Sequence, residues 1–91
     1  MPRGDGLKRR ISAMFEMPKE IVLNLPVVNM VGTEEVGIEN YKGLIEYTDE
    51  QVRVLTTAGV LKIQGLGMVL RQITAESIVI SGKIIHIGYI G

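Results

Sequence analysis

The sequence predicts an all-β domain, a small antiparallel roll or flattened sandwich, preceded by one amphipathic helix. Three observations support this prediction. Apolar residues at two-residue spacing dominate after Pro18, which is typical of half-buried antiparallel strands. Turn-forming clusters separate these stretches by about two to five residues, whereas parallel neighbours need connections of a dozen or more. Before Pro18, the apolar residues fall at helical spacing instead.

The N-terminal arm, residues 1 to 18, is expected to contain a helix over about residues 5 to 17. Asp5 is a suitable N-cap, and Pro18 forces Met17 out of helical geometry, which ends the helix. One helical face is apolar with basic margins, which suits docking to a membrane or a membrane-bound partner. The alternatives are a groove in a partner protein and a cap over an open end of the β core. The candidate docking face consists of Leu7, Lys8, Arg10, Ile11, Met14 and Phe15.

Residues 19 to 91 are expected to form a single β domain. Pro26 removes a backbone donor from the first apolar segment, which predicts a split or bulged edge strand there. Period-2 alternation assigns to the core Val52, Val54, Leu61, Ile63, Met68, Leu70, Ile78 and Ile80. It leaves on the outside Leu55, Val60, Val69 and Val79. Apolar residues on outer faces predict a homo-oligomer.

A partial repeat relates the last two apolar segments. An offset of 17 residues superimposes Leu61 on Ile78, Ile63 on Ile80, Gly65 on Gly82, Met68 on Ile85, Leu70 on Ile87 and Ile73 on Ile90. Each unit alternates, reaches a glycine and alternates again, so it is either a strand pair around a tight bend or one strand kinked at the glycine. Two copies are too few for a solenoid, which favours the roll.

Composition argues against several functional classes. A chain of 91 residues buries too little surface to build a deep cleft or a large cofactor cage. It has no Cys and a single His, which excludes disulfides, a thiol nucleophile and a His-based metal site. Ten basic residues balance ten acidic ones, and 4% aromatic content offers no base-stacking platform, so nucleic-acid binding is not expected. The sequence predicts a non-enzymatic protein without cofactor or metal.

Neither a membrane span nor a secretion signal is expected. No apolar run approaches the roughly 20 residues of a transmembrane helix. The basic cluster near the N-terminus is followed by few apolar residues before Glu16. We therefore expect a cytoplasmic protein.

Two polar features could suggest chemistry. Alternation places His86 on the strand face that it shares with Ile84, and no nucleophile motif accompanies it. Asp49 and Glu50, with Glu46 nearby, lack the ligand spacing of a calcium loop. We interpret His86 as a structural or exposed residue and the acidic cluster as a solvated turn.

Four segments resemble the YabP/YqfC family of sporulation proteins, in particular its YqfC branch. They are PKEIVLNLP at residues 18–26, ENYKG at 39–43, GVLKI-x-G at 59–65 and ISGKI at 80–84. The resemblance covers roughly residues 19 to 90 and depends on the order and spacing of these segments. Gly67 and Gly88 depart from the family pattern, where polar residues are expected.

The resemblance implies a small non-enzymatic protein made during endospore formation. It implies action in the mother cell with a membrane partner resembling YqfD. We further expect peripheral contact at the forespore-facing membrane. The resemblance implies no catalytic residues. A structural homo-oligomer, such as a ring or coat component, is the alternative that the apolar outer positions favour.

Overall fold

The computed structural model describes residues 24–90, which form one six-stranded antiparallel sheet and contain no helix. The strands are β1 (Val27–Val31), β2 (Glu35–Glu39), β3 (Gly43–Tyr47), β4 (Gln51–Thr56), β5 (Gly59–Ile73) and β6 (Ser77–Ile90). Their order in the sheet is β1-β2-β6-β5-β4-β3. The predicted antiparallel all-β architecture is confirmed. The helix expected over residues 5 to 17 lies outside the described residues.

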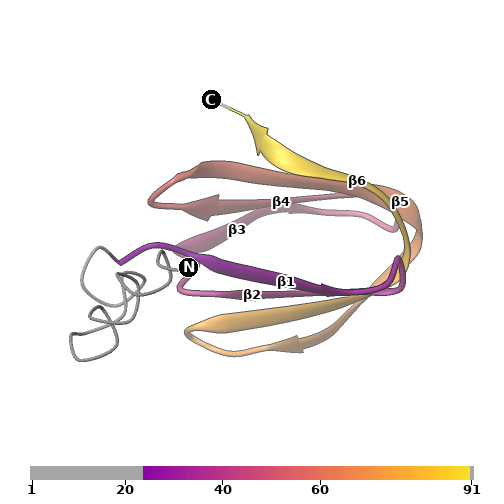
Figure 1. The fold of residues 1–91 in the computed structure, drawn as a ribbon, viewed down its shortest axis with the longest axis horizontal. Coiled ribbons are helices and arrows are strands. Elements are labelled where there is room, and N and C mark those ends of the chain that lie inside the picture. Colours follow the sequence, from indigo (N-terminus) through magenta and orange to yellow (C-terminus); the bar gives the residue numbers. More distant parts are fainter. Residues whose placement is uncertain (1–23, 91) are drawn as a thin grey trace, which may run out of the picture.

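The two long strands, β5 and β6, run through both halves of the sheet (Figure 1). β4 pairs with β5 only along residues 59–64, and β2 pairs with β6 only along residues 77–81. Between these regions both long strands bend, so the two halves of the sheet face each other (Figure 1). One layer contains β3, β4, the first half of β5 and the end of β6. The other layer contains β1, β2 and the remaining halves of the long strands.

Glycines occupy the bend because the two long strands touch backbone to backbone there. A Cβ on Gly65 would overlap the carbonyl oxygen of Lys83, and a Cβ on Gly82 would lie 2.7 Å from the Cα of Met68. Gly82 also has a φ of +146°, which side chains with a Cβ rarely adopt. The repeat predicted from the sequence therefore corresponds to single strands kinked at a glycine. The two units pair with each other antiparallel, as a roll requires and a solenoid does not.

A β-bulge follows the bend in β6. Gly65 pairs with Ile84 and Gln64 pairs with His86, so Ile85 is the extra residue. Ile84 continues the inward alternation of Ile78 and Ile80 and is buried, and the extra residue after it leaves His86 exposed on the outer face of the sheet. The sequence-based placement of His86 on the same face as Ile84 is wrong, because alternation assumes an uninterrupted strand.

The core fills the space between the two layers. It consists of Val36, Ile38, Val52, Val54, Leu61, Ile63, Met68, Ile78, Ile80 and Ile84. All core residues predicted from the sequence belong to this set except Leu70, which is half-buried against it. Of the predicted outer residues, Leu55 and Val69 are exposed, while Val60 and Val79 are half-buried. The prediction missed Val36 and Ile38 of β2 and Ile84, which lies before the bulge.

β1 is an edge strand that begins directly after Pro26. Asn40, in the left-handed region with a φ of 64°, donates a side-chain hydrogen bond of 3.0 Å to the carbonyl oxygen of Leu25. This bond fixes the start of β1 next to the end of β2. The predicted edge position is confirmed, whereas the first part of the segment lies before residue 24 and is not described.

Candidate functional site

One side of the two-layered domain is closed by contacts between β3 and the second half of β5. The hydroxyl of Tyr47 accepts a hydrogen bond of 3.1 Å from the backbone N–H of Leu70. The hydroxyl of Tyr41, just before β3, donates to the carbonyl oxygen of Thr74. These bonds hold the two layers together along this side.

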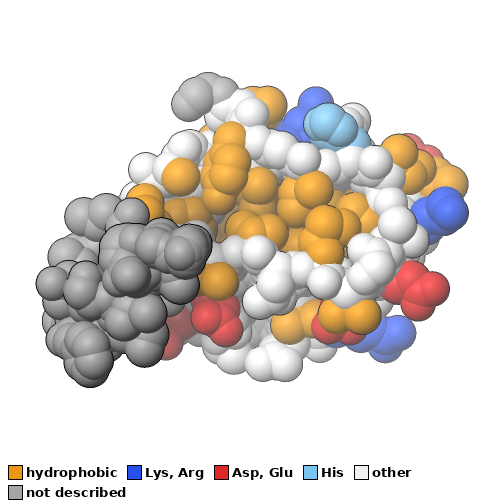
Figure 2. Space-filling view, in the orientation of Figure 1, with side chains coloured by type: hydrophobic (Ala, Val, Ile, Leu, Met, Phe, Trp, Pro, Cys, Tyr) orange, Lys and Arg blue, Asp and Glu red, His pale blue; other side chains and the backbone are white. Residues whose placement is uncertain are grey.

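The opposite side is open. There β1 is the edge of one layer, and residues 85–90 of β6 are the edge of the other, because β2 covers β6 only along residues 77–81. We call this part of the domain the open side. An apolar groove of about 410 Å³ lies between the two edges, and Figure 2 shows hydrophobic side chains gathered in this hollow. Its lining includes Pro26, Val28, Met30, Leu61, Ile87 and Tyr89.

Two side chains of the groove face the core and are nonetheless exposed. Tyr89 pairs with Leu61, and Met30 pairs with Val36, so each lies on the same face of the sheet as a buried partner. Tyr89 is 47% exposed and Met30 is 42% exposed. Because each is already more than half buried, covering the remainder would contribute about 1 kcal/mol each, roughly half the value for a fully exposed side chain. The core of the described domain is therefore incomplete on the open side.

The open side carries no formal charge apart from the ionisable His86. β1 contains no acidic or basic residue, and neither do positions 84–90 apart from His86. Natural edge strands are usually protected by charged residues, proline or a covering element. An uncharged edge beside an apolar groove can accept a further extended strand and bury its apolar side chains.

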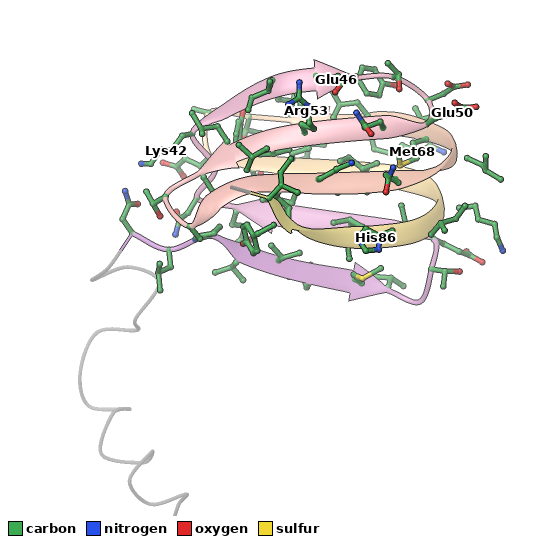
Figure 3. The ribbon with its side chains drawn as sticks, turned by 90° about the horizontal axis from the view of Figure 1, so that it is seen from above. Lys42, Glu46, Glu50, Arg53, Met68 and His86 are labelled. Carbon is green, nitrogen blue, oxygen red and sulfur yellow. The ribbon has the colours of Figure 1, made fainter. Side chains whose placement is uncertain are left out.

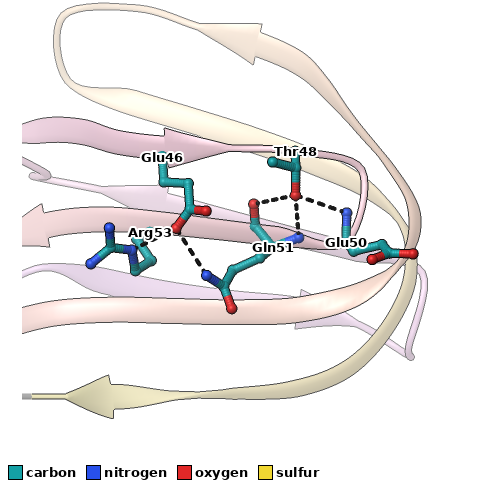
Figure 4. Close-up of polar contacts among 5 residues, drawn as sticks. All are labelled: Glu46, Thr48, Glu50, Gln51 and Arg53. Carbon is teal, nitrogen blue, oxygen red and sulfur yellow. Dashed lines mark hydrogen bonds and ion pairs between the residues drawn. The ribbon is translucent and has the colours of Figure 1, made fainter.

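The main polar cluster lies on β3, β4 and their turn (Figure 4). Glu46 Oε1 accepts hydrogen bonds from Gln51 Nε2 at 2.9 Å and from Arg53 Nε at 2.7 Å. The bond from Gln51 has the largest effect and the bond from Arg53 the next largest, and together they hold the pKa of Glu46 below its ordinary value. Thr48 Oγ1 accepts from the backbone N–H groups of Glu50 and Gln51 and closes the turn. The cluster stabilises a hairpin.

Acidification is expected to weaken the β3–β4 hairpin through Glu46. Because its folded-state pKa lies below the ordinary 4.5, its ionised form stabilises the fold above that value, and this stabilisation is lost as the pH falls through the folded-state pKa. Glu46→Gln should therefore make unfolding less sensitive to acid. Urea unfolding at about pH 7 and about pH 3.5 measures this. Glu50→Gln is the matched control; equal acid sensitivity of the Glu46→Gln variant and wild type would contradict the prediction.

The polar residues singled out from the sequence do not converge on one site. Figure 3 shows His86 far from Glu46 and Glu50, which both belong to the β3–β4 hairpin. Within residues 24–90, no three His, Asp or Glu side chains gather in a group that could hold a metal ion. The same part of the chain has no helix that is long and apolar enough to cross a membrane. The candidate docking face, from Leu7 to Phe15, lies outside the described residues.

Sequence reasoning missed the groove. Its residues are ordinary apolar positions of strands, and their exposure depends on which strand ends first. One signal was available, since the apolar segment at 77–90 is much longer than the segment at 35–39 that pairs with it. Such a difference in length leaves part of the longer strand as an edge.

The comparison with known proteins covers nearly the whole chain. Residues 24–91 match the model of the YabP family. The chain is 30% identical over 88 residues to a protein of Bacillus subtilis (strain 168) described as "Uncharacterized protein YqfC". The matched residues make up 97% of this chain and 95% of that relative. No solved structure matches it. The range matched by the family model includes all six strands and therefore both edges of the groove.

Proposed function

Since this chain belongs to the YabP/YqfC family, we propose that it is a non-enzymatic sporulation factor that acts through protein–protein contacts. The open side carries this proposal, because Met30 and Tyr89 face the core there and remain 42% and 47% exposed. An apolar surface of this kind is typical of an interaction site. The resemblance to sporulation proteins supplies the process in which the contacts take place.

The proposal includes a location and a partner. The protein would act in the mother cell at the forespore-facing membrane, with a membrane partner resembling YqfD. The family resemblance supports this part, together with the amphipathic pattern of the candidate docking face. Lys8 and Arg10 would each contribute about 1 kcal/mol near an anionic lipid surface.

Introducing charge on the open side is expected to abolish function. In a spore-forming host that lacks its own copy, wild-type protein should restore heat-resistant spores, and Met30→Lys/Tyr89→Lys should not. The control Leu55→Lys/Val69→Lys changes outer-face residues of similar exposure, 44% and 46%, and should restore spores. Immunoblots establish that all variants accumulate equally. Full spore formation by the Met30→Lys/Tyr89→Lys strain would contradict the proposed role of the open side.

Membrane fractionation of the same host tests the candidate docking face. Ile11→Ser/Phe15→Ser should move the protein into the soluble fraction without unfolding it. If the apolar face covers the β core instead, this variant should melt at a lower temperature than wild type. Lys8→Glu/Arg10→Glu should weaken membrane attachment if the face docks on a membrane, and should change little if the face covers the β core.

A structural homo-oligomer, such as a ring or coat component, is the second proposal. The exposed Leu55 and Val69 on the outer faces favour it. Under this proposal the control variant Leu55→Lys/Val69→Lys would lose spore formation, and the open-side variant would retain it.

A further inference from the structure

We infer that the open side joins two copies of this chain in a twofold dimer. In this dimer, β6 pairs antiparallel with β6 of the second copy, and the two β1 strands lie side by side in the other layer. The inference rests on the proposed function, because it names the partner that covers the same open side.

Backbone hydrogen-bonding groups along the edge of β6 point toward this second copy. Thr56 and Gly59 flank the two-residue turn between β4 and β5, so they form a hydrogen-bonded pair. Backbone N–H and C=O groups point to alternate sides of β5 from one residue to the next. Those of Lys62 therefore point toward its β6 partner, Gly88. The N–H and C=O groups of the next residue, Tyr89, consequently point away from β5. The described part of the chain places no strand on that side.

The arrangement of the two edges favours a second copy over a single peptide. Within residues 24–90, β1 and residues 85–90 of β6 are free edges of different layers on the same side of the domain. One extended peptide can pair with only one of them. A second copy presents the same two edges at the same separation, so a twofold axis normal to the layers brings β6 to β6 and β1 to β1 together. Both layers would then continue across the contact.

Charge also favours contact between identical edges. A twofold contact brings the same residues from both copies close together, so charged residues would repel their own kind. The open side has no Asp, Glu, Lys or Arg on β1 or at positions 84–90. The edge strand on the closed side, β3, instead carries Glu46, which is paired with Arg53.

Pairing centred on Ile87 would bury the most exposed apolar residues of the edge. Ile85 of each copy then lies opposite Tyr89 of the other copy. These side chains are 62% and 47% exposed in the single chain. Tyr89 would extend the core face of the sheet across the contact and cover the groove.

The test uses the opposite positions of Ile85 and Tyr89. Full-length wild-type chain should have twice the 10.0 kDa chain mass in sedimentation at micromolar concentration. Ile85→Lys/Tyr89→Lys and Ile85→Glu/Tyr89→Glu should each raise the dimer dissociation constant at least about tenfold, because like charges then face each other. Mixing the two variants should restore a dimer, since each Lys faces a Glu. Leu55→Lys/Val69→Lys should remain dimeric.

Three results would overturn the dimer: a wild-type monomer up to about 100 μM, unchanged dimerisation of both charged variants, or no heterodimer on mixing. Circular dichroism checks that the variants are folded. If they are not, Tyr89→Pro serves instead, because the one backbone donor that it removes points outward, and should still weaken the dimer; Tyr89→Ala is the control for the lost side chain. A monomeric wild type whose Met30→Lys/Tyr89→Lys variant loses spore formation would refute the dimer and leave the proposed function intact.

Discussion

Gly82→Ala is expected to lower the free energy of unfolding by at least about 3 kcal/mol, or to prevent folding altogether. The added Cβ would lie 2.7 Å from the Cα of Met68 and 2.9 Å from the carbonyl oxygen of Gly67. Both contacts are with backbone, which cannot rotate away as a flexible side chain can. The φ of +146° adds strain for any residue with a Cβ. Urea unfolding followed by circular dichroism measures the loss.

Gly65→Ala should have an effect of similar size, because its Cβ would overlap the carbonyl oxygen of Lys83 across the bend. Gly43→Ala is the matched control, since a Cβ there meets no atom within 4 Å and its φ is not positive. That change should be neutral or slightly stabilising, as it reduces the freedom of the unfolded chain. Near wild-type stability of Gly65→Ala or Gly82→Ala would show that the long strands do not approach each other this closely.

Ile84→Ala is expected to cost about 2 to 5 kcal/mol, whereas Ile85→Ala should change the unfolding free energy by less than about 0.5 kcal/mol. The two neighbours differ because Ile84 continues the inward alternation of Ile78 and Ile80 and is 5% exposed, whereas Ile85 is the extra residue of the bulge and is 62% exposed. Removing a buried side chain loses its transfer energy and leaves a cavity. Unfolding midpoints of the two variants are compared at protein concentrations where sedimentation finds only monomer, so that dimerisation makes no contribution.

The opposite ranking would follow from the 17-residue repeat. The repeat equates Ile85 with Met68, which is buried in the core. A larger loss for Ile85→Ala than for Ile84→Ala would therefore contradict the register of β5 and β6 and favour the alignment of Ile85 with Met68. The comparison distinguishes the register of β6 from the alignment given by the repeat, because both substitutions remove the same atoms from adjacent positions.

The fold class and most of the core follow from local properties of the sequence. Alternation marks Leu61 and Ile63 as inward on one segment and Ile78 and Ile80 on the next, and the structure buries all four. Short turns between these segments allow only antiparallel neighbours. Each of these features depends on residues close in sequence, so it could be predicted without knowing what lies opposite.

The bend, the bulge and the open side depend on contacts between distant residues. Alternation could not distinguish a hairpin from a kinked strand at Gly65 and Gly82, because the choice is made where the two long strands bend in close backbone contact. The extra residue at Ile85 shifts the later positions to the other face, which the sequence pattern does not show. Met30 and Tyr89 lie on the core face of the sheet; Met30 is exposed because it lies on the edge strand β1, and Tyr89 because β2 is shorter than β6. Burial is a property of the assembled layers, so neither residue could be assigned to a groove from its own strand.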